Sequence, residues 1–99
     1  MAKYFLTNKA VDDLAKIYEY TYESWFERQA DKYYEELIDY CQLLSENPSI
    51  GKNYREIESE LHGFVVNKHI IFYRISGNLE IEIVRIPGAE MDLKNRLKG

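Results

Sequence analysis

Cysteine, proline, glycine and histidine are scarce in this chain of 99 residues, which has 1 Cys, 2 Pro, 5 Gly and 2 His. The single cysteine, Cys41, excludes an intrachain disulfide and is typical of a reducing compartment, so we expect a cytoplasmic protein. The glycines stand singly along the chain, which excludes a glycine-rich phosphate-binding loop. Because Cys41, His62 and His69 have no partners at ligand spacing, the sequence predicts neither a metal site nor a cofactor.

Long apolar runs and an excess of basic charge are also missing. No run approaches the roughly 20 apolar residues that a membrane helix needs, and Met1 leads directly into a strand-like segment, so we expect neither a membrane span nor a cleaved leader. The net charge is −4, and the acidity lies in residues 1–63, which carry 13 Asp/Glu against 7 Lys/Arg. Proteins that bind nucleic acid through its phosphates are usually basic. We therefore expect no direct, specific binding of nucleic acid.

The first half of the chain has the apolar spacing of two helices. Residues 4–6 are a short strand candidate, and Thr7 or Asn8 can cap the helix that follows. Apolar residues at helical spacing continue to about residue 26 and resume from about 28 to 46, where Pro48 ends the second helix. The short break between the two stripes predicts an antiparallel helical hairpin, with Cys41 as a small buried side chain.

The second half has the spacing of strands. Residues 63–67, 69–75 and 79–86 are strand candidates, joined by turns at 67–68 and 76–78, where Gly77 and Asn78 tolerate a positive φ. Residues 52–62 are predicted to be irregular or partly helical, Pro87 to break the sheet, and 90–98 to form a short helix. The chain 1–99 is therefore predicted to be one α+β domain of two layers, with an N-terminal strand, an antiparallel helical hairpin, a three-stranded antiparallel meander and a short C-terminal helix.

The strand at 69–75 is apolar on both faces. Ile70 and Phe72 point one way, whereas Ile71, Tyr73 and Ile75 point the other way. A two-layer domain of this size covers only one face of its sheet with its own helices. We therefore expect a partner to cover the other face.

Few residues suggest catalysis. Paired carboxylates such as Asp12 and Asp13 are expected to be solvated surface charge, and no serine lies in a nucleophile-elbow context. RNA cleavage without metal needs a base, an acid and cations around the phosphate. The candidates for those roles are Lys68, His69, Tyr73, Arg74 and Arg85. His69 and Arg74, however, point to opposite faces of one strand.

Three kinds of side chain keep more than one interpretation. His69 is either a structural histidine bonded to its surroundings, a partner contact or a catalytic group. Arg85 is either half of a structural ion pair or a contact to a partner. The tyrosines of the two predicted helices, Tyr20 and Tyr34 among them, either cover helix surface or line a groove for another chain.

An ordered set of short motifs covers nearly the whole chain. It consists of Leu6-Thr7, Ala10, Asp13-Leu14, Ile17-Tyr18-Glu19-Tyr20, Trp25, Gln29-Ala30, Tyr33-Tyr34, Leu44, Asn47-Pro48, Gly51-Lys52, His69-Ile70-Ile71-Phe72-Tyr73-Arg74, Ile83-Val84-Arg85-Ile86 and Met91-Asp92-Leu93. In these motifs and their spacing the chain resembles the ParE-type toxins of the RelE/ParE superfamily.

The resemblance implies the toxin of a type II toxin–antitoxin pair, which inhibits DNA gyrase by binding rather than by catalysis and is neutralised by a ParD-like antitoxin that wraps around it. It assigns target binding to Arg85, Met91, Asp92 and Arg96. We expect the antitoxin to contact Tyr20, Tyr34, His69, Phe72 and Arg74. The alternatives are a RelE-like ribosome-dependent mRNA endonuclease and a non-toxic relative that only binds the antitoxin.

One segment departs from the family pattern. After Arg85-Ile86 the family usually has Leu-His, one variable residue and Arg before Met-Asp, whereas this chain has Pro87, Gly88, Ala89 and Glu90. The replacement removes basic and polar groups and adds an acid. If that segment acts on the target, the change bears directly on toxicity.

Overall fold

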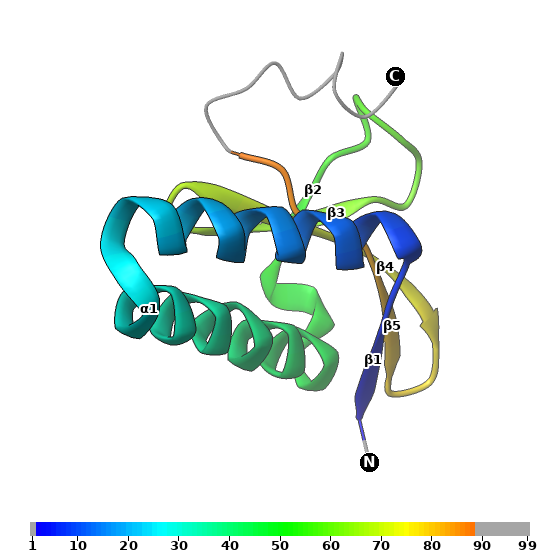
Figure 1. The fold of residues 1–99 in the computed structure, drawn as a ribbon. Coiled ribbons are helices and arrows are strands. Elements are labelled where there is room, and N and C mark those ends of the chain that lie inside the picture. The colour runs from blue at the N-terminus through cyan, green and yellow to red at the C-terminus, as the bar shows by residue number, and fades with distance from the viewer. Residues whose placement is uncertain (1, 89–99) are drawn as a thin grey trace.

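The computed structural model describes residues 2–88, and residues 1 and 89–99 are not described. The elements in chain order are β1 (Lys3–Leu6), α1 (Asn8–Glu46), the 3-10 helix η1 (Pro48–Ile50), β2 (Lys52–Asn53), β3 (His62–Val66), β4 (His69–Gly77) and β5 (Glu80–Arg85). The strands form one sheet in the order β1-β5-β4-β3-β2, in which β1 runs parallel to β5 and the other pairs are antiparallel. With α1 packed on this sheet, the predicted α+β class is confirmed (Figure 1). The predicted helix at 90–98 lies outside the described residues.

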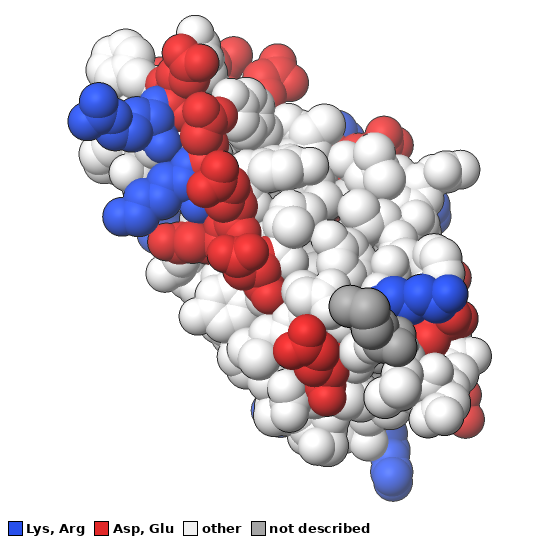
Figure 2. Space-filling model, turned by 90° about the horizontal axis from the view of Figure 1, so that it is seen from below, with Lys and Arg blue, Asp and Glu red and all other residues white. Residues whose placement is uncertain are grey.

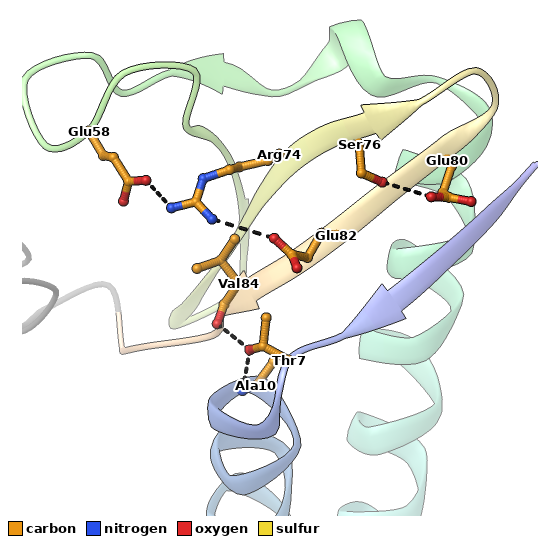
Figure 3. Close-up of polar contacts among 8 residues, drawn as sticks. All are labelled: Thr7, Ala10, Glu58, Arg74, Ser76, Glu80, Glu82 and Val84. Carbon is orange, nitrogen blue, oxygen red and sulfur yellow. Dashed lines mark hydrogen bonds and ion pairs between the residues drawn. The ribbon is translucent and has the colours of Figure 1, made fainter.

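The long helix α1 begins at a side-chain cap and reverses in its middle. Thr7 has extended backbone angles, and its Oγ1 accepts a hydrogen bond from the Ala10 N–H at 3.1 Å while donating to the Val84 carbonyl at 2.8 Å (Figure 3). At Phe26 the backbone leaves the helical region, with φ 70° and ψ 175°. The two halves, 8–25 and 27–46, therefore run side by side in opposite directions (Figure 1), as the predicted hairpin requires.

The main core lies between α1 and one face of the sheet. Its buried members are Ala10, Leu14, Ile17, Leu37, Cys41, Leu44, Val66, Ile71, Tyr73, Ile81, Ile83 and Ile86. Cys41 is fully buried, as predicted, and burial raises the pKa of its thiol to about 12. Since only the thiolate is a good nucleophile, this cysteine is a packing residue.

The chain itself covers the opposite face of the sheet over Ile70 and Phe72, which corrects the expectation that a partner must cover these residues. Residues 54–61, which we call the strap, cross this face and bury Ile70 and Phe72 beside Leu61. The edge of the Tyr54 ring meets the Phe72 ring at 5.1 Å between centroids. The polar composition of 52–62 concealed this role, because the apolar residues of the strap follow neither the helix nor the strand period.

One hydrogen bond joins the two ends of the strap, and an ion pair attaches its middle to the sheet. The Tyr54 N–H donates to the Leu61 carbonyl at 2.8 Å, which closes the loop on itself. Arg74 on β4 pairs with Glu58 of the strap and, at 3.4 Å, with Glu82 on β5 (Figure 3). The strap is thus part of the folded domain.

The ends of the strands differ from the prediction in three places. The two-residue strand β2 was not predicted. The positive φ of the β4–β5 turn falls on Leu79, at 56°, and Gly77 instead ends β4. Pro87 does not end the pairing either, because its carbonyl accepts the Ile70 N–H at 3.0 Å and Gly88 bridges His69. Proline lacks an N–H but keeps its acceptor, so it can occupy this position.

Candidate functional site

A carboxylate on α1 holds the end of β5. Asp13 accepts hydrogen bonds from Arg85 Nε at 2.8 Å, from Arg85 Nη2 at 3.2 Å and from the Ile86 N–H at 2.9 Å. The hydrogen bond to Asp13 raises the pKa of Arg85, against a smaller effect of burial. Of the two interpretations of Arg85, the structure therefore supports the structural ion pair, which Arg85 forms with Asp13. The expectation that Asp13 is solvated surface charge is wrong, since a distant strand occupies its carboxylate.

Beside this ion pair lies a small hollow. It has a volume of about 190 Å³ and is lined by Asp13, Lys16, Ile17, Tyr20, His69, Arg85, Ile86, Pro87 and Gly88. His69 Nδ1 lies 2.7 Å from the Tyr33 hydroxyl, and burial lowers the pKa of His69 although Asp13 acts in the opposite direction. The imidazole is therefore mainly neutral at pH 7, as suits a structural histidine whose ring nitrogen is hydrogen-bonded.

A second, apolar depression lies along the helical hairpin. It has a volume of about 320 Å³ and is lined by Leu6, Val11, Leu14, Ala15, Tyr18 and Tyr34, which we call the α1 groove. Val11 is 49% exposed and Tyr34 39% exposed. The Tyr18 and Tyr34 rings meet edge to face at 6.0 Å. These side chains form an apolar surface that the described part of the chain leaves open.

Tyr18 joins the apolar wall of the groove to its polar edge, where Asp31 lies. The Tyr18 O–H donates to Asp31 Oδ1 at 2.7 Å, and this hydrogen bond raises the pKa of Tyr18 to about 12. In the view from below in Figure 2, a file of acidic side chains separates a few basic ones from a broad uncharged area. An apolar channel with an acidic edge can hold a peptide.

The five candidates for RNA cleavage do not meet at one site. Tyr73 is buried, and its hydroxyl donates to the Pro48 carbonyl at 2.7 Å and accepts from the Gly51 N–H at 3.1 Å. Arg74 lies on the strap side of the sheet and His69 on the helix side, as predicted from their spacing. Within residues 2–88, no group of three or more His, Cys, Asp or Glu is placed to hold a metal ion.

The residues expected to meet an antitoxin occupy three different places. Tyr34 lines the α1 groove, while Tyr20 and His69 line the hollow beside Arg85. Arg74 and Phe72 lie on the strap side. Phe72 is 0% exposed beneath the strap, so it offers no surface to a partner in this conformation. Met91, Asp92 and Arg96 lie outside the described residues.

Sequence reasoning held open a groove lined by helix tyrosines, and Tyr18 and Tyr34 do line the α1 groove. It missed the apolar wall of that groove and the role of Asp13. The sequence does indicate this apolar wall. With Val11, Ala15, Tyr18 and Tyr22, the apolar stripe of α1 is wider than one core can cover. No pattern in the sequence indicates the Asp13–Arg85 pair, since 72 residues separate the partners and only the tertiary fold brings them together. No helix among the described residues is long and apolar enough to cross a membrane.

Known proteins match this chain along nearly its full length. A family model described as the ParE toxin of the type II toxin–antitoxin system parDE matches residues 4–93. Toxin ParE1 of Mycobacterium tuberculosis is 31% identical over 96 residues, covering 97% of this chain and 98% of that protein. Toxin ParE1 of Caulobacter vibrioides is 27% identical over 97 residues, covering 98% and 99%.

The fold has a counterpart among solved structures. A chain of the structure described as the chromosomal ParDE TA system from P. aeruginosa matches with a TM-score of 0.77 at 22% identity, covering 91% of this chain and 98% of that chain. Fold and sequence together define the toxin component of a type II toxin–antitoxin system. The chain belongs to the ParE toxin family, which confirms the resemblance seen in its motifs.

Proposed function

We propose that this chain arrests bacterial growth by binding DNA gyrase and that a ParD-like antitoxin neutralises it by covering the α1 groove. The observation that carries the antitoxin part is the open apolar groove on a member of the ParE family. Apolar and aromatic side chains such as Val11 and Tyr34 are the usual centre of a protein–protein contact. The inhibition itself requires binding and no chemical step.

The two partners would use different parts of the chain. Tyr34 in the groove, with Tyr20 and His69 at the hollow, is the proposed antitoxin surface. Met91, Asp92 and Arg96 remain the proposed target contacts, together with the end of β5. Because the Arg85 guanidinium is bound by Asp13, its proposed role is to orient the chain that follows Ile86 rather than to touch gyrase directly.

Induced expression in a bacterium tests the proposal as a whole. Expression of this chain should cause filamentation and a DNA-damage response, and co-expression of the small protein encoded beside it should restore growth. The purified chain should inhibit gyrase supercoiling and leave topoisomerase-free controls unchanged. Ribosome-dependent cutting of mRNA by the purified chain, with supercoiling unaffected, would reject gyrase inhibition in favour of the RelE-like alternative.

A truncation separates the two surfaces. A chain that ends at Gly88 keeps the pairing of Pro87 and Gly88 with β4 and removes the proposed target contacts. It should lose growth arrest but still bind the antitoxin as tightly as the full chain. Equal arrest by both chains would place the toxic surface within residues 1–88.

A further inference from the structure

The second half of α1 carries a regular series of acids beside the groove. Its exposed members follow one another at intervals of four residues: Glu27, Asp31, Glu35 and Asp39. Four residues are slightly more than one turn, so this series forms a continuous file along the helix, about 18 Å long at about 1.5 Å per residue. Figure 2 shows a file of acidic side chains on the face seen from below.

Two acids of the file, Asp31 and Glu35, lie nearer to the groove than the bases Arg28 and Lys32 of the same helix half. At about 100° per residue, Asp31 and Glu35 lie about 60° and 100° around the helix from Tyr34, whereas Arg28 and Lys32 lie about 120° and 160° away in the same sense. The hydrogen bond from Tyr18 to Asp31 places one carboxylate directly at the groove wall. The basic side chains therefore lie behind the acidic file as seen from the groove.

The first half of α1 repeats this order on the other side of the groove. Beyond the apolar wall, Glu19 and Glu23 are exposed and lie about 100° and 140° around the helix from Tyr18, on the side of Ala15. Both long edges of the α1 groove are thus acidic. A ligand in the groove meets apolar side chains at its centre and negative charge on both flanks.

We propose that the antitoxin segment that fills the α1 groove is a basic amphipathic helix, with an apolar stripe flanked on both sides by Lys or Arg. This inference rests on the proposed function, which supplies the antitoxin as occupant. Charge complementarity sets its chemistry, because opposite charges across a rim favour association and like charges oppose it. A second copy of this chain does not fit, since a self-complementary contact through the same surface would bring acid against acid.

Two synthetic peptides of the same length test the chemistry. Each is an 18-residue alanine-based helix with an identical leucine stripe, flanked by lysine in one peptide and by glutamate in the other. A third peptide has the composition of the lysine peptide in scrambled order. Fluorescence anisotropy of each labelled peptide with the full chain should show the lysine peptide binding about tenfold or more tightly than the glutamate peptide. The scrambled peptide should bind more weakly than the ordered one.

Charge-removal variants locate the preference on the protein. The double change Asp31→Asn with Glu35→Gln should weaken binding of the lysine peptide about three- to tenfold. The matched control, Glu56→Gln with Glu60→Gln, removes the same charge from the strap and should change binding less than twofold. Raising salt from about 50 to 300 mM should narrow the difference between the lysine and glutamate peptides.

The outcomes separate this inference from the proposed function. Equal binding of both ordered peptides, binding of neither, or equal loss in the two double variants would overturn the basic-helix inference, even if the antitoxin restores growth. Conversely, a chain that prefers the lysine peptide but never arrests growth would reject the proposed toxicity and leave the chemistry of the groove intact.

Discussion

At the scale of single residues, Asp13 links the two ends of the fold. Its carboxylate accepts three hydrogen bonds, all from Arg85 and Ile86. A charge-assisted hydrogen bond contributes about 1.5–3 kcal/mol, and a partly buried charge that loses its partner adds a desolvation cost. The position therefore contributes far more to stability than a surface acid does.

Asp13→Ala is expected to lower the free energy of unfolding by about 2–4 kcal/mol, because it leaves the Arg85 guanidinium and the Ile86 N–H without their acceptor. Urea denaturation monitored by circular dichroism measures the change. Asp12→Ala, at the exposed neighbouring position, is the matched control and should stay within about 0.5 kcal/mol of the wild type. Similar losses at both positions would contradict the role of Asp13.

Phe26, in contrast to Asp13, destabilises the fold through its backbone conformation. A φ of 70° with ψ of 175° is a region that essentially only glycine adopts, at a cost of about 1–3 kcal/mol for other residues. Because Phe26 is 77% exposed, Phe26→Gly loses little burial and should raise the free energy of unfolding by about 1 kcal/mol. Gln29→Gly, at a helical position nearby, should instead cost about 1 kcal/mol. Destabilisation by both changes would show that the turn is not strained.

His69 makes the stability depend on pH. Burial lowers its pKa from the ordinary value of 6.5, so the unfolded chain binds the proton more tightly than the folded one. The neutral imidazole therefore contributes stability above about pH 6.5, and this is lost as the pH falls through the folded pKa. The free energy of unfolding should decrease from pH 7 to 5, and less steeply in His69→Gln. His62→Gln, which keeps His69, should retain the steeper decrease.

At the scale of elements, the strap is held by burial more than by charge. Arg74 and its partners are partly exposed, and ion pairs of this kind contribute about 0–1 kcal/mol. Leu61→Ala should therefore cost about 2–4 kcal/mol, and Arg74→Gln less than about 1 kcal/mol. Thermal or urea denaturation gives both values, and limited proteolysis should cut the strap faster in Leu61→Ala. The reverse ranking would mean that the ion pairs hold the strap.

The elements that the sequence predicts are those with local signals. The Thr7 cap, the end of the helix before Pro48 and the apolar run of β4 each depend on a few neighbouring residues, and all were found. The strap, the parallel pairing of β1 with β5 and the Asp13–Arg85 pair depend on residues far apart in the chain. Neither spacing nor propensity reports such contacts, so their part of the candidate site required the structure.

At the scale of the whole molecule, the proposed coverage of the α1 groove predicts that the stability of this chain depends on the antitoxin. A partner that binds only the folded state stabilises it by about 4 kcal/mol at a thousandfold excess over its dissociation constant. The melting temperature of this chain should therefore rise by several degrees with saturating antitoxin. In the Asp31→Asn, Glu35→Gln double variant the rise should be smaller at the same antitoxin concentration. An unchanged melting temperature at saturation would contradict coverage of the groove.

The parallel pairing of β1 with β5 sets the order in which the chain becomes functional during its synthesis. Residues Lys3 to Leu6 of β1 pair with Glu80 to Ile83 of β5. The sheet therefore cannot be completed until almost the whole chain has been synthesised. At about 5–20 residues per second, roughly 2–8 s pass between the synthesis of the end of α1 and that of β5. During that interval the core side chains of α1 have no complete sheet to pack against. If an antitoxin covers the α1 groove as proposed, its contacts on α1 are synthesised before the sheet can close.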